Sequence, residues 1–131
     1  MKHKPEKRWL KEPEVHDYPA AESYLALLFD EKTSRRVVRQ LERAKISNFK
    51  AKDIFRASGL PLLPPSNSHV RQDQQKLTSG KKISPLLLVR DNAGAKLIIA
   101  DGYHRLCAVY SLDEDAIIPC KIVSRSGSPG S

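Results

Sequence analysis

The hydrophobic positions of the chain follow a helical period in its first half and a strand-like pattern in its second half. Residues 20–29 form a short apolar stretch preceded by Pro19, a residue that favours the start of a helix. Residues 35–45 show amphipathic spacing, and we expect Ser34 to cap this second helix. Its apolar face is expected to hold Val37, Val38, Leu41 and Ala44.

Two further helices are expected before the pattern changes. Residues 51–60 predict a short helix that is stopped by Gly59. Residues 60–68 contain three prolines and cannot hold regular structure. Residues 69–80 then predict another helix. The inward positions of that helix are Val70, Gln74 and Leu77.

The second half of the chain predicts strands. Residues 85–90 are an apolar run opened by a proline, residues 91–94 suit a hairpin turn, and residues 96–100 suit the returning strand. A helix starts near Leu106, and residues 117–123 close the fold as a last strand. The expected architecture is an α+β domain with a small mixed sheet and a helical N-terminal half.

Length and composition limit this fold to one domain, because the chain has 131 residues. We expect residues 1–17 to be a flexible arm, residues 18–123 to be the domain, and residues 124–131 to be a disordered tail. No apolar stretch approaches the roughly 18 residues that span a bilayer, and the N-terminus lacks the apolar region of a signal peptide. Cys107 and Cys120 lie in apolar contexts, which indicates reduced buried thiols in a cytoplasmic protein, with a disulfide as the alternative.

The net charge of +8 is concentrated in part of the chain. Residues 31–60 hold nine Lys or Arg against three Asp or Glu. Such a region suits an anionic partner, either a nucleotide or a nucleic acid, and a solvated surface is the other interpretation. A non-specific nucleic-acid contact would use Arg35, Arg36, Arg39 and Arg43. Residues 51–60 could also act as the second helix of a helix-turn-helix.

Residues 98–112 carry the strongest chemical signal, because Asp-Gly-Tyr-His-Arg interrupts an aliphatic run between a strand and a helix. The first turn of a helix has unpaired N–H groups and the positive end of the dipole, so this loop suits a phosphate. Gly102 permits close approach of a ligand. Arg105 is expected to offer an exposed fork of donors, and His104 another donor. Asp101 could accept a hydroxyl proton, hold a magnesium ion or cap the helix.

These residues also have structural alternatives. His104 could bond to a backbone carbonyl, and Tyr103 could either stack on a base or cover the loop. Arg105 could pair with Asp101 or with the acids at residues 113–115. No cluster of His, Cys and carboxylate groups has the spacing of a metal site, so we expect no structural metal.

Five short motifs are spread over residues 62–123, a segment that makes up about half of the chain. They are PPSN, KLTSG, SPLLLV, GYHRLCA and IPCKIV. With these motifs the segment resembles the ParB/sulfiredoxin superfamily, the fold of the N-terminal domain of the chromosome-partition protein ParB. The resemblance implies a ParB-like fold whose Gly-x-x-Arg loop cradles a nucleotide phosphate.

The resemblance also implies roles for single residues. The phosphate-binding loop corresponds to Gly102, Tyr103, His104 and Arg105. Tyr103 stands where sulfiredoxins have their catalytic cysteine, so we expect no sulfinic-acid reductase activity. Free-serine kinases of this fold carry an Asp-Gly-His-x-Arg loop in which the Asp helps phosphoryl transfer. Asp101 and Arg105 keep that spacing, while the histidine falls one place later.

Two hypotheses of function follow. The first is a nucleotide-binding or phosphate-binding ParB-like domain that takes ATP or CTP with magnesium, with or without hydrolysis or phosphotransfer through Asp101. The second is a nucleic-acid-binding or regulatory module that uses the basic helices without catalysis. Because the chain ends soon after the last motif, operator binding and clamp formation of the ParB kind are not expected.

Overall fold

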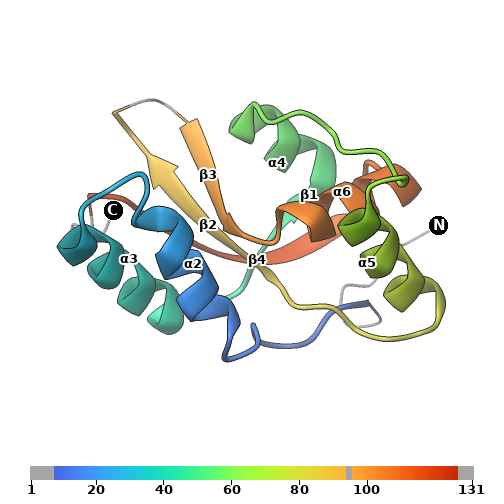
Figure 1. Cartoon of the computed structure of the whole chain (residues 1–131), viewed down its shortest axis with the longest axis horizontal. Helices are drawn as coiled ribbons and strands as arrows, with labels where there is room; N and C mark the ends of the chain where they lie inside the picture. The colour runs from blue at the N-terminus through green and yellow to red at the C-terminus, as the bar shows by residue number, and fades with distance from the viewer. Residues whose placement is uncertain (1–7, 94–95, 127–131) are drawn as a thin grey trace.

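A four-stranded mixed sheet forms the centre of the structure (Figure 1). The computed structural model describes residues 8–93 and 96–126. The strand order is β1-β4-β2-β3, with β1 at Ser47–Lys50, β2 at Leu86–Asp91, β3 at Lys96–Asp101 and β4 at Ile117–Ser124. β2 pairs antiparallel with β3 and parallel with β4, and β1 pairs antiparallel with β4. The α+β class and the mixed sheet are confirmed.

The three expected strands lie where the sequence pattern predicts them, to within one residue at each end. The expected hairpin turn at residues 91–94 runs into residues 94–95, which lie outside the described part. The last residues of the expected tail and the first residues of the expected arm, 127–131 and 1–7, also lie outside it.

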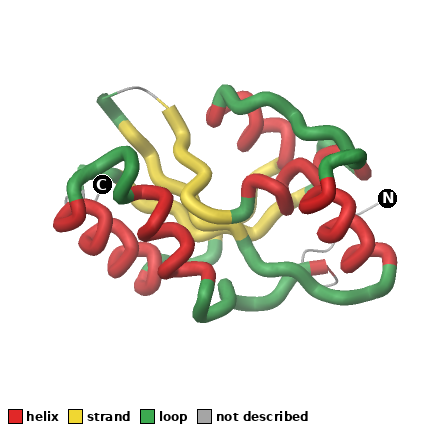
Figure 2. Tube along the Cα trace, in the orientation of Figure 1, coloured by secondary structure: helices red, strands yellow, loops and turns green. Residues whose placement is uncertain are grey.

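Two helices from the N-terminal half cover one face of the sheet, as Figures 1 and 2 show. α2 (Asp17–Leu25) and α3 (Glu31–Arg43) form a hydrophobic core with the side chains of Leu87 and Val89. The helical character of this part of the chain is confirmed. α2 ends at Leu25, before the expected residue 29. The chain continues there in turns, because Leu27 is 84% exposed and does not pack in the core.

The other face of the sheet is covered by helices that follow later in the chain. α4 (Ala51–Ser58) and α6 (Tyr103–Leu112) form a second core with Leu86 and Leu88. Because both faces are covered, β2 is apolar at successive positions rather than at alternate ones. α5 (Ser68–Thr78) packs on α6, and Val70, one of its expected inward positions, is buried there. No helix in the described ranges is long and apolar enough to cross a membrane.

The start of α3 differs from the expectation. Asp30 is the N-cap, and its Oδ1 accepts a hydrogen bond from the N–H of Thr33 at 2.7 Å. Ser34 lies inside the helix, where its hydroxyl donates to the Asp30 carbonyl oxygen at 2.9 Å. The prediction of Ser34 as the cap is therefore wrong. A carboxylate at this position accepts an unpaired N–H and also faces the positive end of the helix dipole, and the hydrogen bonds from Thr33 lower the pKa of Asp30.

The sequence pattern did not predict β1. Its four residues alternate between half-buried and exposed, and they pair with β4 through Phe49 and Ile118 among others. This strand separates α3 from α4, which lie on opposite faces of the sheet. The two helices therefore do not form the helix-turn-helix that the sequence left open.

The segment before α2 contributes to the core. Trp9 is 2% exposed and belongs to the core beneath α4 and α6. The backbone of this segment bonds to Ile83, from Leu10 N–H to the Ile83 carbonyl at 2.8 Å and from Ile83 N–H to the Arg8 carbonyl at 2.9 Å. The described part of the expected arm, from residue 8 onward, is thus fixed to the segment that leads into β2.

Candidate functional site

Gly102 joins the end of β3 to the start of α6. Its φ of +112° lies in a region that residues with a Cβ rarely adopt. A Cβ at this position would lie 2.8 Å from Cγ of Leu86 and 3.0 Å from Nη2 of Arg105. Glycine is therefore required both by the backbone and by the packing, and it lets α6 begin directly against the sheet.

The first turn of α6 has no side-chain cap among the described residues. In contrast, Asn67 caps α5 and accepts hydrogen bonds from the N–H groups of His69 and Val70. The first N–H groups of a helix have no acceptor within the helix. Binding of an anion by the N–H groups of Tyr103 and His104 stays a prediction.

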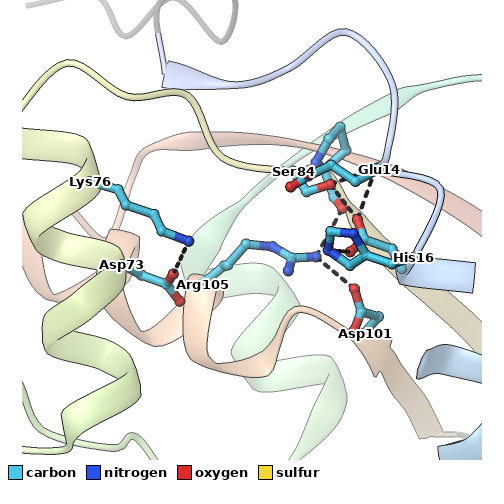
Figure 3. Close-up of polar contacts among 9 residues, drawn as sticks. Glu14, His16, Asp73, Lys76, Ser84, Asp101 and Arg105 are labelled. Atoms are coloured by element: carbon cyan, nitrogen blue, oxygen red, sulfur yellow. Dashed lines mark hydrogen bonds and ion pairs between the residues drawn. The ribbon is translucent and has the colours of Figure 1, made fainter.

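Arg105 is paired within the protein (Figure 3). Its Nη2 donates to Oδ2 of Asp101 at 2.9 Å and to the carbonyl oxygen of Pro85 at 3.2 Å. The exposed fraction is 16% for the Arg105 side chain and 18% for the Asp101 side chain. The prediction of an exposed loop guanidinium is wrong, and the alternative of a pair with Asp101 is confirmed. The two residues lie one helical turn apart in sequence, which brings the guanidinium back over the end of β3.

Asp101 is engaged in the same contact through its Oδ2. Burial raises the pKa of Asp101 above its usual value, and the charge of Arg105 only partly offsets this effect. Among the residues that the structure describes, no group of three or more His, Cys, Asp or Glu side chains is arranged to hold a metal ion.

A polar cluster from the N-terminal segment lies next to this pair (Figure 3). The hydroxyl of Ser84 donates to Oδ2 of the buried Asp17. The N–H of Glu14 donates to the same carboxylate at 3.0 Å and to Ser84 Oγ at 2.9 Å. His16 lies 3.4 Å from the other carboxylate oxygen, measured from its Nε2. These contacts connect the start of α2 to the loop before β2, beside the phosphate-binding candidate.

On its other side, the loop meets the first turn of α5. The ring of His104 lies 4.8 Å from the ring of His69, measured between centroids. Lys76 and Asp73 form an ion pair at 3.9 Å on the same helix, and Figure 3 shows Arg105 extending beside them. The sequence did not predict that His69 lies here, because no local pattern links two histidines that belong to different helices.

Two groups in this cluster have shifted pKa values. Burial lowers the pKa of His104, and the neighbouring His69 lowers it further. Burial raises the pKa of Asp73, although the charges of Arg105 and Lys76 oppose that shift. His104 is therefore predominantly neutral near pH 7, and an anion bound beside it would favour its protonated form.

Tyr103 covers the loop. Its hydroxyl donates to the carbonyl oxygen of Pro61, and its ring packs against the core around Val70. Burial raises the pKa of Tyr103, and Cys107 contributes to the shift. Cys107 and Cys120 are both buried free thiols, as expected, and burial raises the pKa of Cys120 to about 12.

The basic residues expected to contact nucleic acid do not form one surface. Arg35, Arg39 and Arg43 are exposed along α3 at a spacing of four residues, with Arg35 3.7 Å from Glu31. Arg36 points elsewhere, because its Nη2 donates to the carbonyl oxygen of Arg125 at 2.9 Å. The basic residues of α4 lie on the opposite face of the sheet, so the charge is divided between two sides of the molecule.

No protein-family model, curated protein or solved structure matches the chain.

Proposed function

We propose that the chain is a nucleotide-binding domain of the ParB/sulfiredoxin-like kind, and that it holds a phosphate group at the N-terminus of α6. The observation that carries this proposal is the first turn of α6, which has no side-chain cap, starts at a glycine and places the His104 ring 4.8 Å from the His69 ring of α5. The resemblance of residues 62–123 to that superfamily supports the same location.

The donors in this proposal are the backbone N–H groups of Tyr103 and His104 together with the rings of His104 and His69. Arg105 contributes its positive charge at short range and keeps its hydrogen bond to Asp101. A helix terminus contributes about 1 kcal/mol at an exposed site, and a micromolar ligand needs about 8 kcal/mol. A phosphate alone is therefore held weakly, and a nucleotide needs contacts to its base or ribose as well.

ATP and CTP with magnesium are the ligands to test first. Magnesium usually keeps several waters and binds through phosphates and one or two carboxylates, so it could arrive with the nucleotide. Hydrolysis or phosphotransfer through Asp101 requires the Asp101–Arg105 pair to open. We therefore propose nucleotide binding as the function. Turnover of the nucleotide would be an additional result of the same experiment.

The test is a thermal-shift screen followed by calorimetric titration with ATP, ADP, CTP and GTP, each with and without magnesium. A ligand present at 100 times its dissociation constant stabilises the fold by about 2.7 kcal/mol. We expect stabilisation by at least one nucleotide, and a weaker effect in His104→Ala. The matched control is Arg43→Ala on α3, which should bind as the wild type does. A wild-type protein that no nucleotide stabilises would contradict the proposal.

The second candidate function is non-specific binding of a nucleic-acid backbone by α3. The observation that favours it is the exposed line formed by Arg35, Arg39 and Arg43. Arginines at this spacing lie on one side of a helix. This contact is independent of the α6 loop, since it lies on the other face of the sheet.

A further inference from the structure

A concave surface that includes no residue of the α6 loop lies on the side of the sheet that α4 covers. It encloses about 400 Å³ and is lined by Phe49, Ile54, Leu88, Leu97 and Ile122, together with Ala57, Asn92 and four charged residues. We call it the α4 groove. Figure 1 shows α4 beside β3.

The groove exists because the helices on this face do not cover the full length of the strands. α4 has eight residues and ends at Gly59, so it spans roughly 12 Å. β2 has six residues and spans roughly 20 Å. α6 lies over the Leu86 end of β2, and at the Arg90 end α4 faces the strands across the groove.

The register of the sheet gives the groove an apolar floor with a cation in it. Arg90 is opposite Leu97 on β3, and Leu88 is opposite Ile122 on β4. Residues opposite each other point to the same face. Arg90 therefore follows Leu86 and Leu88 on the face toward α4, at a position where a fully covered sheet would have another apolar residue.

The charges around the groove do not cancel. Asp53 has a cation nearby, with Arg56 at 4.0 Å, and Asp91 lies 3.7 Å from Arg125. Arg90 and Lys96 form no ion pair with any described residue. The lining itself has two carboxylates and two cations; with Arg56 and Arg125 included, four cations face two carboxylates, so the net charge at the groove is positive.

From this arrangement we infer that the α4 groove binds a small molecule with an apolar body and a carboxylate group. The body would lie on Leu88, Leu97 and Ile122, and the carboxylate would bind Arg90, whose planar donors suit a carboxylate. The volume falls within the range of small-molecule sites, which are mostly apolar with a few polar groups that fix orientation. This site is independent of the proposed nucleotide site.

The experiment is a titration of the isotope-labelled full chain with octanoate, followed by the NMR shifts of its backbone amides. Octanol provides the same long alkyl chain without the charge, and acetate provides the carboxylate without the long alkyl chain. We expect octanoate to shift amides that line the groove and to bind at least tenfold more tightly than either comparison compound, since a hydrogen bond to a charged group contributes about 1.5–3 kcal/mol.

Two variants test the location. Arg90→Gln should weaken octanoate binding about tenfold or more, and Ala57→Phe should block the groove from its exposed helical side. The control Arg43→Gln removes the same charge from the opposite face and should bind octanoate as the wild type does. Equal binding of octanoate and octanol, unchanged binding in Arg90→Gln or Ala57→Phe, or shifts confined to the α6 loop would each overturn the inference. Absence of octanoate binding by the wild type would overturn it as well.

Discussion

Gly102 is the residue on which the connection between β3 and α6 depends. Replacement with alanine adds a Cβ at φ +112°, within 2.8 Å of Leu86. We expect Gly102→Ala to lower the free energy of unfolding by about 3 kcal/mol, from backbone strain and overpacking together. Urea denaturation measures this value. Gly80→Ala is the matched control, because its φ is +84° and a Cβ there meets no atom within 4 Å. It should cost about 1 kcal/mol, and equal losses in the two variants would contradict the packing explanation.

We expect Arg105 to contribute more to the stability of the fold than to ligand binding. Arg105→Gln leaves the largely buried Asp101 without its ion-pair partner, so the free energy of unfolding should fall by about 3 kcal/mol. Adding Asp101→Asn should recover part of the loss, because the uncompensated carboxylate is then gone. A double-mutant cycle of unfolding energies checks this. If Arg105→Gln keeps its stability but loses nucleotide affinity, the guanidinium serves the ligand instead.

His104 should make anion binding depend on pH. Its pKa is lowered in the folded protein, mainly by burial. In the absence of an anion, its contribution to stability is therefore greatest above the unfolded pKa of about 6.5 and decreases as the pH falls toward the folded pKa. An anion beside the ring favours the protonated form, so affinity should rise over the same interval. Sulfate is a suitable probe, since its charge does not change there.

The measurement is a calorimetric titration of sulfate at several pH values between 5 and 8. We expect the wild type to gain affinity toward the acidic end and His104→Gln to gain clearly less. His69→Gln should move the gain to higher pH, because His69 lowers the pKa of His104. A profile in His104→Gln that matches the wild type would exclude His104 as the titrating group.

Among the helices, α3 is the one that could hold a nucleic-acid backbone. Reversing Arg35, Arg39 and Arg43 to glutamate should remove DNA binding, which we expect near ~10⁻⁵ M at physiological salt. Three phosphate contacts give a slope of about −2.7 in log affinity against log salt. Fluorescence anisotropy with a labelled duplex measures both quantities. Nucleotide binding at α6 should survive in the triple variant.

Arg36 serves as the comparison on the same helix. Its guanidinium bonds to the Arg125 carbonyl, so Arg36→Gln should change stability more than DNA affinity. Sequence-specific, salt-resistant binding of duplex DNA by the wild type would make α3, rather than the α6 loop, the principal functional site.

Across the entire chain, the N-terminal segment is joined to the core through Trp9. The side chain is 2% exposed, and we expect Trp9→Ala to lower the free energy of unfolding by about 3–5 kcal/mol. Trp9 is the only tryptophan, so its emission should shift to longer wavelength on unfolding and report the transition directly in the wild type. Circular dichroism follows unfolding of the variant.

Val15→Ala is the control, because Val15 belongs to the same segment and is 86% exposed. Its effect should stay within about 0.5 kcal/mol. A loss of less than that in Trp9→Ala would mean that the segment rests on the surface without stabilising the core.

The sequence alone determined the class of the fold and most of its elements. Strands β2, β3 and β4 were predictable because their apolar runs are bounded by Pro, Asp and Gly, and α5 because its inward positions follow the helical period. The Asp-Gly signal also located the turn before α6. These features are local, since they depend on backbone preference and on burial of a face, which neighbouring residues already specify.

The tertiary structure decided which residues and which elements contact one another. β1 is a strand because β4 lies beside it, and its four residues carry too little pattern to predict one. Local sequence offered Arg105 several partners, and the fold selected Asp101 and the Pro85 carbonyl. His69 meets His104 only because α5 packs on α6. The same packing divides the basic residues between two faces and leaves Arg90 in an open groove. Contacts between residues far apart in sequence depend on how the helices and strands assemble, and no local period encodes that.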